Sequence, residues 1–255
     1  MNGDVLVDAA TFTVGAGDRA PAVLHRSGAA PPLRCASLLK PLLFWAAAGL
    51  PGPAADEGRW AELAGPAVAH SANDPTVTVW DGCGRDALLD RLAELGGTRW
   101  RCDPSATPTF GKVLVRATEV AGAYARLAVS AREGDAVAGR LLGWMRTVAD
   151  RQTFGARAAA ATSLGVDPSV VAVKSGWFCD TDEVSARTHA VTVTTLPDGS
   201  VRGTAVLTAV PLGAEERAEY TATYREGDEV LPVHERLAGP LIASTTQGLL
   251  TSLPA

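Results

Sequence analysis

Residues 33–50 read Leu-Arg-Cys-Ala-Ser-Leu-Leu-Lys-Pro-Leu-Leu-Phe-Trp-Ala-Ala-Ala-Gly-Leu and are apolar almost throughout. Between Arg34 and Asp56 the only charged residue is Lys40. A run of this kind should be buried on nearly all of its sides, and an ammonium group is costly to bury without a compensating interaction. The position of Lys40 therefore needs a structural or chemical reason.

Pro41 indicates where the helix in this stretch begins. Proline is tolerated in the first turn of a helix, where its missing N–H would have no intrahelical partner. This predicts Ser37 at or next to the helix N-terminus, and Gly49, followed by Leu-Pro-Gly-Pro, should end the helix. Residues three apart share a helical face, so we expect the Lys40 amine to reach the Ser37 hydroxyl.

The pair Ser37 and Lys40 fits nucleophilic catalysis. Desolvation lowers the pKa of a buried lysine, and a partly neutral amine can take the proton of a serine hydroxyl. The backbone N–H of Ser37 is then available to an oxyanion. The alternative is a buried helix in which Ser37 only caps the N-terminus and Lys40 extends along its own stem to water. Since Ser-x-x-Lys also occurs by chance, the rest of the chain must decide.

The composition is that of a globular protein without a basic surface. The 255 residues are 47% hydrophobic and 20% charged, with a net charge of −5. A chain of this length can form one large domain or two lobes with a shared interface. It has no run of four or more lysines and arginines, so we expect no nucleic-acid partner and no binding to a membrane surface.

The sequence shows no targeting or membrane-spanning signal. The N-terminus, Met-Asn-Gly-Asp-Val-Leu-Val-Asp, lacks a basic region followed by an apolar one, and the apolar run 38–50 is too short to span a bilayer. As given, the chain is expected to be cytoplasmic. If its N-terminus is that of a mature protein, it is expected to be secreted.

Four cysteines, Cys35, Cys83, Cys102 and Cys179, form no Cys-x-x-Cys pair and have no histidine at zinc-ligand spacing. We therefore expect no metal site, and nothing in the sequence calls for a cofactor. In a reducing compartment the thiols would be small buried side chains, which is the interpretation we favour. In an oxidising compartment, Cys35 with Cys179 and Cys83 with Cys102 are the pairings to test.

The hydrophobic pattern predicts an α+β protein. Short strands come first, a helical middle follows, and from Val170 onward the sequence is rich in Val and Thr, with a hairpin signal at Leu196-Pro197-Asp198-Gly199. The expected strands are 10–14, 21–25, 170–178, 187–194, 201–210 and an edge strand at 219–224; the expected helices are 55–64, 86–95, 115–131, 136–148 and a tail from 230 that breaks near Gly239-Pro240. This order predicts a helical lobe inserted into an antiparallel sheet lobe.

Three short motifs follow one another along these elements. They are Ser37-Leu38-Leu39-Lys40 on a helix, Ser71-Ala72-Asn73 in a loop, and Lys174-Ser175-Gly176 on the 170–178 strand. In this order and context they resemble the S-x-x-K, S-D-N or S-x-N, and K-[TS]-G motifs of the serine β-lactamase and penicillin-binding protein superfamily, most closely those of class A β-lactamases. The resemblance covers the chain from about Thr11 to Val210.

This resemblance implies a β-lactamase/transpeptidase-like fold with the active site between the two lobes. We expect the sheet lobe to comprise residues 1–45 and 160–255 and the helical lobe residues 46–159, together forming one structural unit.

The resemblance also implies a catalytic role for several motif residues. Ser37 would be the acylated nucleophile and Lys40 its base. Ser71 would relay a proton to the leaving nitrogen, and Asn73 would hold both the substrate amide and Lys40 in place. Lys174 would raise the positive potential beside Ser71.

Other residues would bind the substrate. Ser175 would contact a substrate carboxylate, Gly176 would let the substrate lie close to the strand, and the N–H groups of Trp177 and Ser37 would form an oxyanion hole. Arg187, on the next strand, is a candidate second carboxylate anchor because a guanidinium binds carboxylates bidentately. The alternative for Arg187 is a solvated strand cation.

Each later motif also has a purely structural interpretation. Ser71-Ala72-Asn73 is compatible with an ordinary Asx or Ser turn, and Lys174-Ser175-Gly176 with a bent strand end. His70, next to Ser71, is more simply a solvated loop histidine. A different serine machinery is disfavoured because the sequence has no Gly-x-Ser-x-Gly elbow.

The chain departs from the class A pattern in ways that affect hydrolysis. Class A enzymes carry a glutamate in the loop before the later helices, where it activates the water that frees the acyl-enzyme. The corresponding loop here, residues 98–104, contains Asp103 as its only acid, a candidate substitute. Ala72 stands where class A enzymes have aspartate. We therefore expect acylation without efficient β-lactam hydrolysis.

The sequence thus predicts a serine acyl-enzyme hydrolase that attacks an amide or ester carbonyl, including that of a β-lactam, through Ser37 activated by Lys40. One alternative is a penicillin-binding-type D-alanyl peptidase, esterase or acyltransferase. Another is a non-catalytic ligand-binding protein that retains the fold. In each enzymatic case the expected partner is a small-molecule or peptide-like substrate with a carboxylate.

Overall fold

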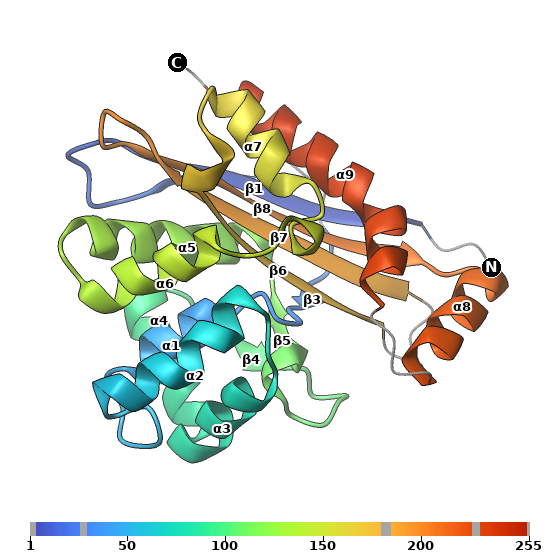
Figure 1. The fold of residues 1–255 in the computed structure, drawn as a ribbon, viewed down its shortest axis with the longest axis horizontal. Helices are drawn as coiled ribbons and strands as arrows, with labels where there is room; N and C mark the ends of the chain where they lie inside the picture. Colours follow the sequence, from blue (N-terminus) through green and yellow to red (C-terminus); the bar gives the residue numbers. More distant parts are fainter. Residues whose placement is uncertain (1–3, 26–29, 180–184, 226–229, 254–255) are drawn as a thin grey trace.

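The computed structural model describes residues 4–25, 30–179, 185–225 and 230–253. Its architecture is α+β, with a central sheet covered by helices on both faces (Figure 1). The strands are β1 (Leu6–Val14), β2 (Ala22–His25), β3 (Leu33–Arg34), β4 (Arg101–Cys102), β5 (Val113–Val115), β6 (Val171–Cys179), β7 (Ser185–Thr195) and β8 (Val201–Pro211). The helices are α1 (Lys40–Ala47), α2 (Glu57–Ala69), α3 (Asp74–Cys83), α4 (Arg85–Gly96), α5 (Ala117–Arg132), α6 (Ala136–Arg146), α7 (Ala156–Leu164), α8 (Ala214–Arg225) and α9 (Leu231–Thr251), with short 3-10 turns η1 (Phe110–Lys112), η2 (Asp150–Gln152) and η3 (Pro168–Val170).

The main sheet is antiparallel and has the strand order β2-β1-β8-β7-β6. The predicted turn at 196–199 joins β7 to β8: Gly199 has a φ of 81°, and the Leu196 N–H donates to Ser200 O at 2.8 Å. β1, from the start of the chain, pairs with β8 in the middle of the sheet. Within the described residues, β6 is therefore an edge strand of this sheet.

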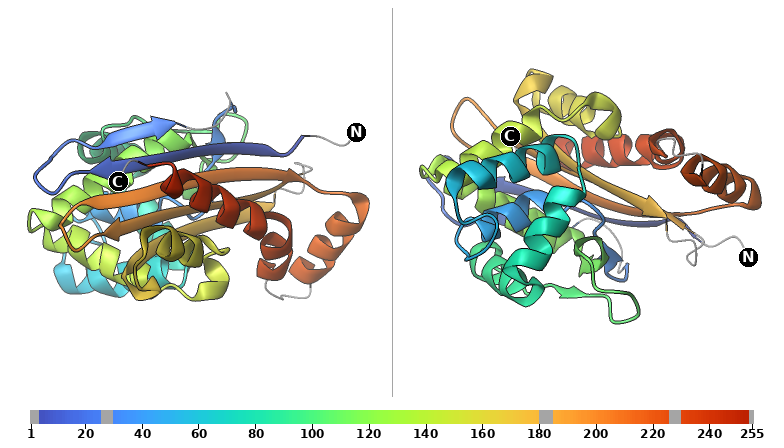
Figure 2. Two further views of the ribbon diagram at one scale, coloured as in Figure 1. Left: turned by 90° about the horizontal axis from the view of Figure 1, so that it is seen from above. Right: turned by 60° about the horizontal axis from the view of Figure 1, so that its bottom comes forward.

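Both faces of the main sheet are apolar, because successive strand side chains point to opposite faces. On β7, Ala190 lies in a buried cluster with Ile242 of α9, whereas Val191 and Val193 lie in the cluster that includes α1, α4 and α5. Figure 2 shows α9 lying along the sheet on the first of these faces. The result is a layer of helices on each side of the sheet.

Helix α5 ties the segment before α1 to the helical layer. The fully buried Tyr124 donates its hydroxyl hydrogen to Leu38 O at 2.6 Å. From the other side, Trp60 of α2 donates its indole N–H to Phe44 O at 2.9 Å. Two aromatic side chains thus fix the backbone around α1 through hydrogen bonds in a dry environment, where an unpaired carbonyl would be costly.

The predicted start of α1 is close but not correct. The helix begins at Lys40 with a proline in its first turn, so Ser37 lies three residues before the helix. The physical reason is the left-handed backbone of Ala36, whose φ is 51° and which places Ser37 in a turn. The Lys40 N–H closes this turn by donating to Ser37 O at 3.3 Å.

Two predictions for the C-terminal part of the chain are wrong. The expected edge strand at 219–224 is part of helix α8, which is rich in good helix formers and has Glu215 and Glu216 in its first turn. The expected break in the tail is absent, because α9 runs without interruption through Pro240. Pro240 is exposed, while its helical neighbours Ala238 and Ile242 are fully buried, so packing outweighs the lost hydrogen bond.

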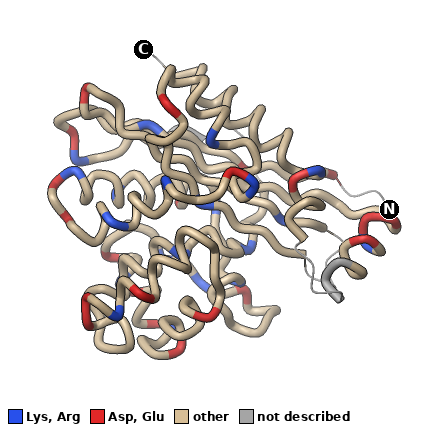
Figure 3. The backbone as a smooth tube through the Cα atoms, in the orientation of Figure 1, with Lys and Arg blue, Asp and Glu red and all other residues tan. Residues whose placement is uncertain are grey.

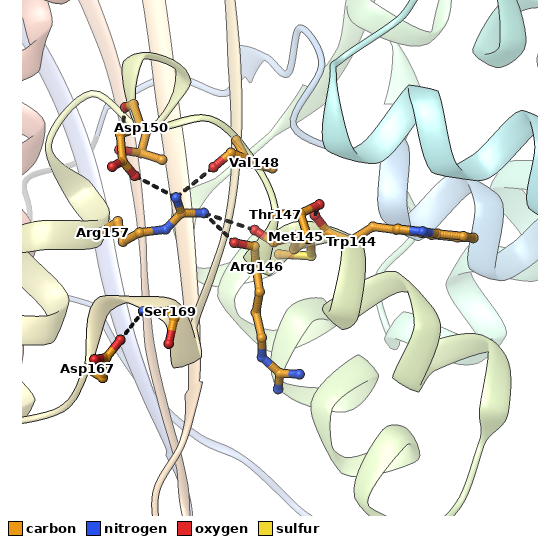
Figure 4. Close-up of polar contacts among 10 residues, drawn as sticks. Trp144, Met145, Arg146, Thr147, Val148, Asp150, Arg157, Asp167 and Ser169 are labelled. Atoms are coloured by element: carbon orange, nitrogen blue, oxygen red, sulfur yellow. Dashed lines mark hydrogen bonds and ion pairs between the residues drawn. The ribbon is translucent and has the colours of Figure 1, made fainter.

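Arg157 connects α7 to the end of α6 (Figure 4). Its buried guanidinium donates to Val148 O at 2.6 Å, Arg146 O at 3.1 Å and Met145 O at 3.3 Å, and to Asp150 Oδ1 at 2.6 Å. The last carbonyls of a helix lack intrahelical partners. One cation therefore satisfies them and fixes the path by which the chain leaves the helical layer and approaches β6.

The lobe boundaries expected at 45/46 and 159/160 remain a prediction. Lysine and arginine side chains are interspersed with aspartate and glutamate over the molecule (Figure 3). Among the described helices, none combines the length and apolar character needed to cross a membrane.

Candidate active site

Ser37 lies in the tight turn 35–39, which is held to η1 and to the first residue of β5. The Cys35 N–H donates to Val113 O at 2.9 Å, and the Ala36 N–H donates to Gly111 O at 3.0 Å. The Ser37 N–H has no backbone acceptor within the described residues. Ser37 itself is partly exposed, so this turn presents a hydroxyl and a backbone donor at the surface of a rigid support.

Lys40 is completely buried and points to the loop after α2. Its Nζ donates to Ser71 O at 2.5 Å, Ala72 O at 2.9 Å and Asn73 Oδ1 at 2.8 Å. In the described part of the chain, Lys40 Nζ makes no hydrogen bond to Ser37. Desolvation lowers the pKa of Lys40 to about 7, so the neutral amine is populated near neutral pH.

Lys174 brings the edge strand β6 to the same loop. Its Nζ donates to Ser71 Oγ at 3.0 Å and to Ser175 O at 2.7 Å. Burial, with a smaller contribution from the charge of Lys40, holds the pKa of Lys174 well below its usual range. Ser71 has a φ of 60°, a left-handed conformation that is uncommon outside glycine and asparagine and that occurs in this case at a site of interacting side chains.

Gly176 is where β6 meets the Ser37 turn. A Cβ atom at this position would lie 2.8 Å from Ser37 N, Leu38 N and Cys35 O. Only glycine permits this approach, because all three atoms belong to the backbone and cannot rotate away. The structure therefore brings all three motifs together: Lys40 and Lys174 both contact the Ser71 loop, and Gly176 contacts the Ser37 turn.

Ser175 and Trp177 differ in how they relate to this site. Ser175 is 1% exposed, and its hydroxyl has no hydrogen-bond partner among the described residues. The Trp177 side chain packs edge-on against Phe154, with ring centroids 5.8 Å apart, in the cluster under α9. At Trp177, only the backbone N–H is therefore a candidate donor for an oxyanion hole. Arg187 stacks over Phe178, its Cζ 5.5 Å from the ring centroid.

The loop between α4 and α5 contributes a residue that the sequence did not indicate. Phe110, in η1, places its ring centroid 5.2 Å from Lys40 Nζ. Asp103, the only acid of residues 98–104, instead accepts from Arg34 Nε at 2.8 Å and from the N–H and hydroxyl of Ser105. Hydrogen bonds from Ser105, with a smaller effect of Arg34, lower the pKa of Asp103 to about 2.

His189 is a second contributor that the sequence analysis missed. Because the Thr208 N–H donates to Nδ1 at 3.2 Å, the ring proton is on Nε2, which donates to Arg34 O at 2.9 Å. Burial lowers the pKa of His189 to about 4, so the ring is neutral. This side chain anchors the residue before the Ser37 turn to the sheet, a long-range contact that leaves no signal in the sequence.

The remaining polar candidates are His70 and the cysteines. His70 is exposed. No disulfide joins the four cysteines in the described structure. Cys35 donates its thiol hydrogen to Phe110 O at 3.2 Å, and burial raises its pKa to about 12. Within residues 4–25, 30–179, 185–225 and 230–253, no group of three or more His, Cys, Asp or Glu side chains is arranged to hold a metal ion.

Comparison with solved structures identifies the fold. The TLA-3 extended-spectrum β-lactamase superposes with a TM-score of 0.61 at 14% identity, covering 98% of this chain and 95% of that one. An ancestral class A β-lactamase gives 0.58 at 17% identity, covering 96% and 94%, and the β-lactamase of Sphaerobacter thermophilus gives 0.58 at 17% identity, covering 98% and 93%. No protein-family model and no curated protein matches the sequence. The chain therefore has the fold of the serine β-lactamases, with class A enzymes among its structural neighbours.

Proposed function

We propose that this protein is a serine acyl-enzyme hydrolase that acts on an amide or ester carbonyl, including that of a β-lactam. Ser37 is the nucleophile, and Lys40, in its neutral form, accepts the hydroxyl proton as the bond from Oγ to the carbonyl carbon forms. The single observation that carries this proposal is the convergence of Lys40 and Lys174 on the Ser71 loop, with bonds of 2.9 Å to Ala72 O and 3.0 Å to Ser71 Oγ.

Proton transfer to the leaving group proceeds through Ser71. Its hydroxyl lies 3.0 Å from Lys174 Nζ, and its carbonyl accepts from Lys40. A proton released by Ser37 to Lys40 can reach the leaving nitrogen or oxygen through this hydroxyl, which acts as general acid. Lys174 stabilises the negative charge that Ser71 would acquire on the way.

Two backbone N–H groups, those of Ser37 and Trp177, hold the developing oxyanion. A Cβ atom on Gly176 would lie only 2.8 Å from Ser37 N, and this close approach supports the pairing because Trp177 is the next residue on β6. Donors of this kind are worth about 3–4 kcal/mol each in comparable sites. A preorganised donor pair lowers the barrier without needing to reorganise during the reaction.

The substrate is a small or peptide-like molecule with a carboxylate. Lys174 Nζ lies 3.0 Å from Ser71 Oγ, and the Ser175 hydroxyl lacks a hydrogen bond among the described residues, so both groups are available as donors to that anion. Asn73 Oδ1 lies 2.8 Å from Lys40 Nζ. The NH2 group of Asn73 can therefore donate to a substrate carbonyl. Arg187 is the second carboxylate anchor in this proposal.

One observation favours a second candidate, a ligand-binding protein without turnover. The side-chain Nζ of Lys40 donates to three oxygens of residues 71–73 and, within the described chain, to no atom of Ser37. Three acceptors match the three hydrogens of the ammonium form, which cannot act as a base. The alternative of a D-alanyl peptidase, esterase or acyltransferase uses the same acylation step and differs only in the acceptor.

Intact-mass spectrometry after treatment with benzylpenicillin and with a fluorophosphonate tests the proposal. We expect an adduct that maps to Ser37 in the wild type and no adduct in the Ser37→Ala control. Turnover of nitrocefin would add hydrolysis of a β-lactam to acylation. An absence of adduct with both reagents would favour the ligand-binding protein, and an adduct that persists in Ser37→Ala would reject Ser37 as the nucleophile.

A further inference from the structure

Two cations from different elements meet at the ring of Phe178, near the end of β6. Lys112 Nζ lies 5.4 Å from the ring centroid, and Arg187 Cζ lies 5.5 Å from the same centroid. All three side chains are partly exposed. A cation over an aromatic face is attracted by the ring quadrupole, so Phe178 holds two positive charges near one place on the surface.

Phe178 faces the same side of the sheet as the candidate site. Side chains alternate along a strand, so Lys174, Gly176 and Phe178 share one face of β6. Gly176 meets the Ser37 turn on that face. Arg187 is the direct partner of Phe178 in the pairing of β6 with β7, and directly opposed residues point to the same face. The ring and the guanidinium therefore lie on the side of the sheet that carries the Ser37 turn.

Lys112 reaches Phe178 from the segment that supports the Ser37 turn. It is the last residue of η1, and the residue before it, Gly111, accepts from the Ala36 N–H at 3.0 Å. Ala36 immediately precedes Ser37. The backbone at Lys112 is thus fixed next to the proposed nucleophile, while its amine extends to the edge strand. The two cations therefore approach the ring from two separate parts of the molecule.

This cation pair is well separated from Lys174. Phe178 lies four residues after Lys174 on β6, which corresponds to about 13 Å along the strand. Gly176, which contacts the Ser37 turn, is midway between them. A single carboxylate cannot span that distance, because its two oxygens share one carbon atom. A carbonyl held at the Ser37 turn would therefore have one cationic group on each side of it along the strand.

We propose that Lys112 and Arg187 form a second anion subsite at the ring of Phe178. The substrate is then a small or peptide-like dicarboxylate that lies along β6, with its reacting carbonyl between its two carboxylates. This inference rests on the proposed function, which places one carboxylate at Lys174 and Ser175 and gives Arg187 a further anchoring role. The guanidinium binds the second carboxylate through two N–H groups, and the ammonium adds a charged donor beside it.

Carbenicillin and benzylpenicillin provide the test, because they differ by one carboxylate on the acyl side chain. The initial rate of adduct formation at Ser37 is measured by intact mass for each reagent, at the same low concentration. We expect the wild type to react at least about tenfold faster with carbenicillin, because hydrogen bonds between charged groups are the strong ones. This preference should fall as salt is added, since salt screens partly exposed charges.

Each variant is judged by the ratio of its two rates, so that a general loss of stability or activity cancels. Lys112→Gln should lower the ratio of the carbenicillin rate to the benzylpenicillin rate, and Lys112→Glu should make carbenicillin the slower reagent. Arg140→Gln is the matched control, because Arg140 also lies over aromatic rings, those of Trp60 and Trp144 in the helical layer. Its ratio should equal that of the wild type.

Equal rates with the two reagents in the wild type would overturn the inference. So would a ratio that stays at the wild-type value in Lys112→Gln, or one that falls as far in Arg140→Gln as in Lys112→Gln. A failure of the proposed function gives a different result, because neither reagent would then form an adduct at Ser37 in the wild type.

Discussion

Lys40 and Lys174 are two buried amines that contact the same loop. Desolvation lowers the pKa of both, and for Lys174 the charge of Lys40 adds to the effect. Ser71 accepts from both amines, from Lys40 through its carbonyl and from Lys174 through its hydroxyl. Both amines therefore release a proton more readily than an exposed lysine does, which suits them to general acid–base chemistry.

The first prediction concerns the pH dependence of acylation. Because the pKa of Lys40 is lowered to about 7, its base form is lost as pH falls below about 7. We expect the rate of Ser37 acylation to fall about tenfold per pH unit below that value and to level off above it. The measurement is the rate of adduct formation with benzylpenicillin across the neutral range.

The control for this profile is His70→Gln, because imidazole is the other common base near neutral pH. Its profile should match that of the wild type. An acylation rate that is independent of pH through this range would argue against Lys40 as the base.

The second prediction concerns Gly176→Ala. The added methyl group would meet three backbone atoms at 2.8 Å and push β6 away from the Ser37 turn. We expect acylation to slow by about 10²–10³-fold, the cost of losing one oxyanion donor. Gly139→Ala is the matched control, since nothing lies within 4 Å of a Cβ there. Equal acylation rates in the two variants would mean that this close approach has no role in the reaction.

At the scale of elements, Arg157 of α7 stabilises the end of α6 and the segment that follows it. Arg157 donates to the carbonyls of Met145 and Arg146 at the end of α6 and to Val148 O, and Asp150 adds an ion pair at 2.6 Å whose acid is 86% exposed. Exposed pairs contribute little, whereas buried carbonyls that lose a charged donor are costly. The stabilisation should therefore come from the carbonyls and not from the ion pair.

The third prediction separates these two contributions. Arg157→Met leaves the carbonyls of residues 145, 146 and 148 without their donor, and we expect a loss of about 2–3 kcal/mol in the free energy of unfolding. Asp150→Asn, which removes only the ion pair, should cost less than about 1 kcal/mol. Urea unfolding of both variants provides the measurement. A larger loss in Asp150→Asn than in Arg157→Met would reverse this assignment.

At the scale of the whole molecule, two buried histidines lie on opposite faces of the sheet. His189 on β7 supports the segment before the Ser37 turn, and His234 on α9 bonds to Thr188 at 2.8 Å. Burial lowers the pKa of each to about 4. Both rings are therefore neutral in the folded protein over most of the pH range, and both helix layers depend on that neutrality.

The fourth prediction follows from these two pKa values. An unfolded histidine titrates near about 6.5, so the unfolded state gains protons first as pH falls. Stability should be complete above about pH 6.5 and decline until about pH 4, by at most about 3 kcal/mol per histidine. Asp103, with a pKa lowered to about 2, adds a separate loss between about pH 3.8 and 2.

Chemical denaturation at a series of pH values checks this profile. His234→Gln should flatten the decline between about pH 6.5 and 4, and the exposed His70→Gln should not. A free energy of unfolding that stays constant over this interval would contradict the assignment of both rings as neutral and buried.

The sequence determined the elements whose signals are local. These elements follow from side-chain periodicity and from the backbone preferences of residues close together in the sequence. They are the Val- and Thr-rich strands, the 196–199 turn and the helix near Pro41. The order of the three motifs also predicted the fold, because each motif lies on an element that could be recognised separately from the sequence. The acylation chemistry stays a prediction, although the structure brings Lys40, Ser71 and Lys174 into contact.

Tertiary structure decided what depends on contacts between distant segments. The wrong strand at 219–224 and the wrong break at Pro240 arose where helix propensity or burial against the sheet outweighed a local signal. Two of these features are contacts between residues far apart in the chain: the ring of Phe110 beside Lys40, and the bond from His189 to Arg34. A third is the left-handed backbone of Ala36. Such features are fixed by packing and desolvation, which act only once the chain has folded, and a sequence pattern does not record them.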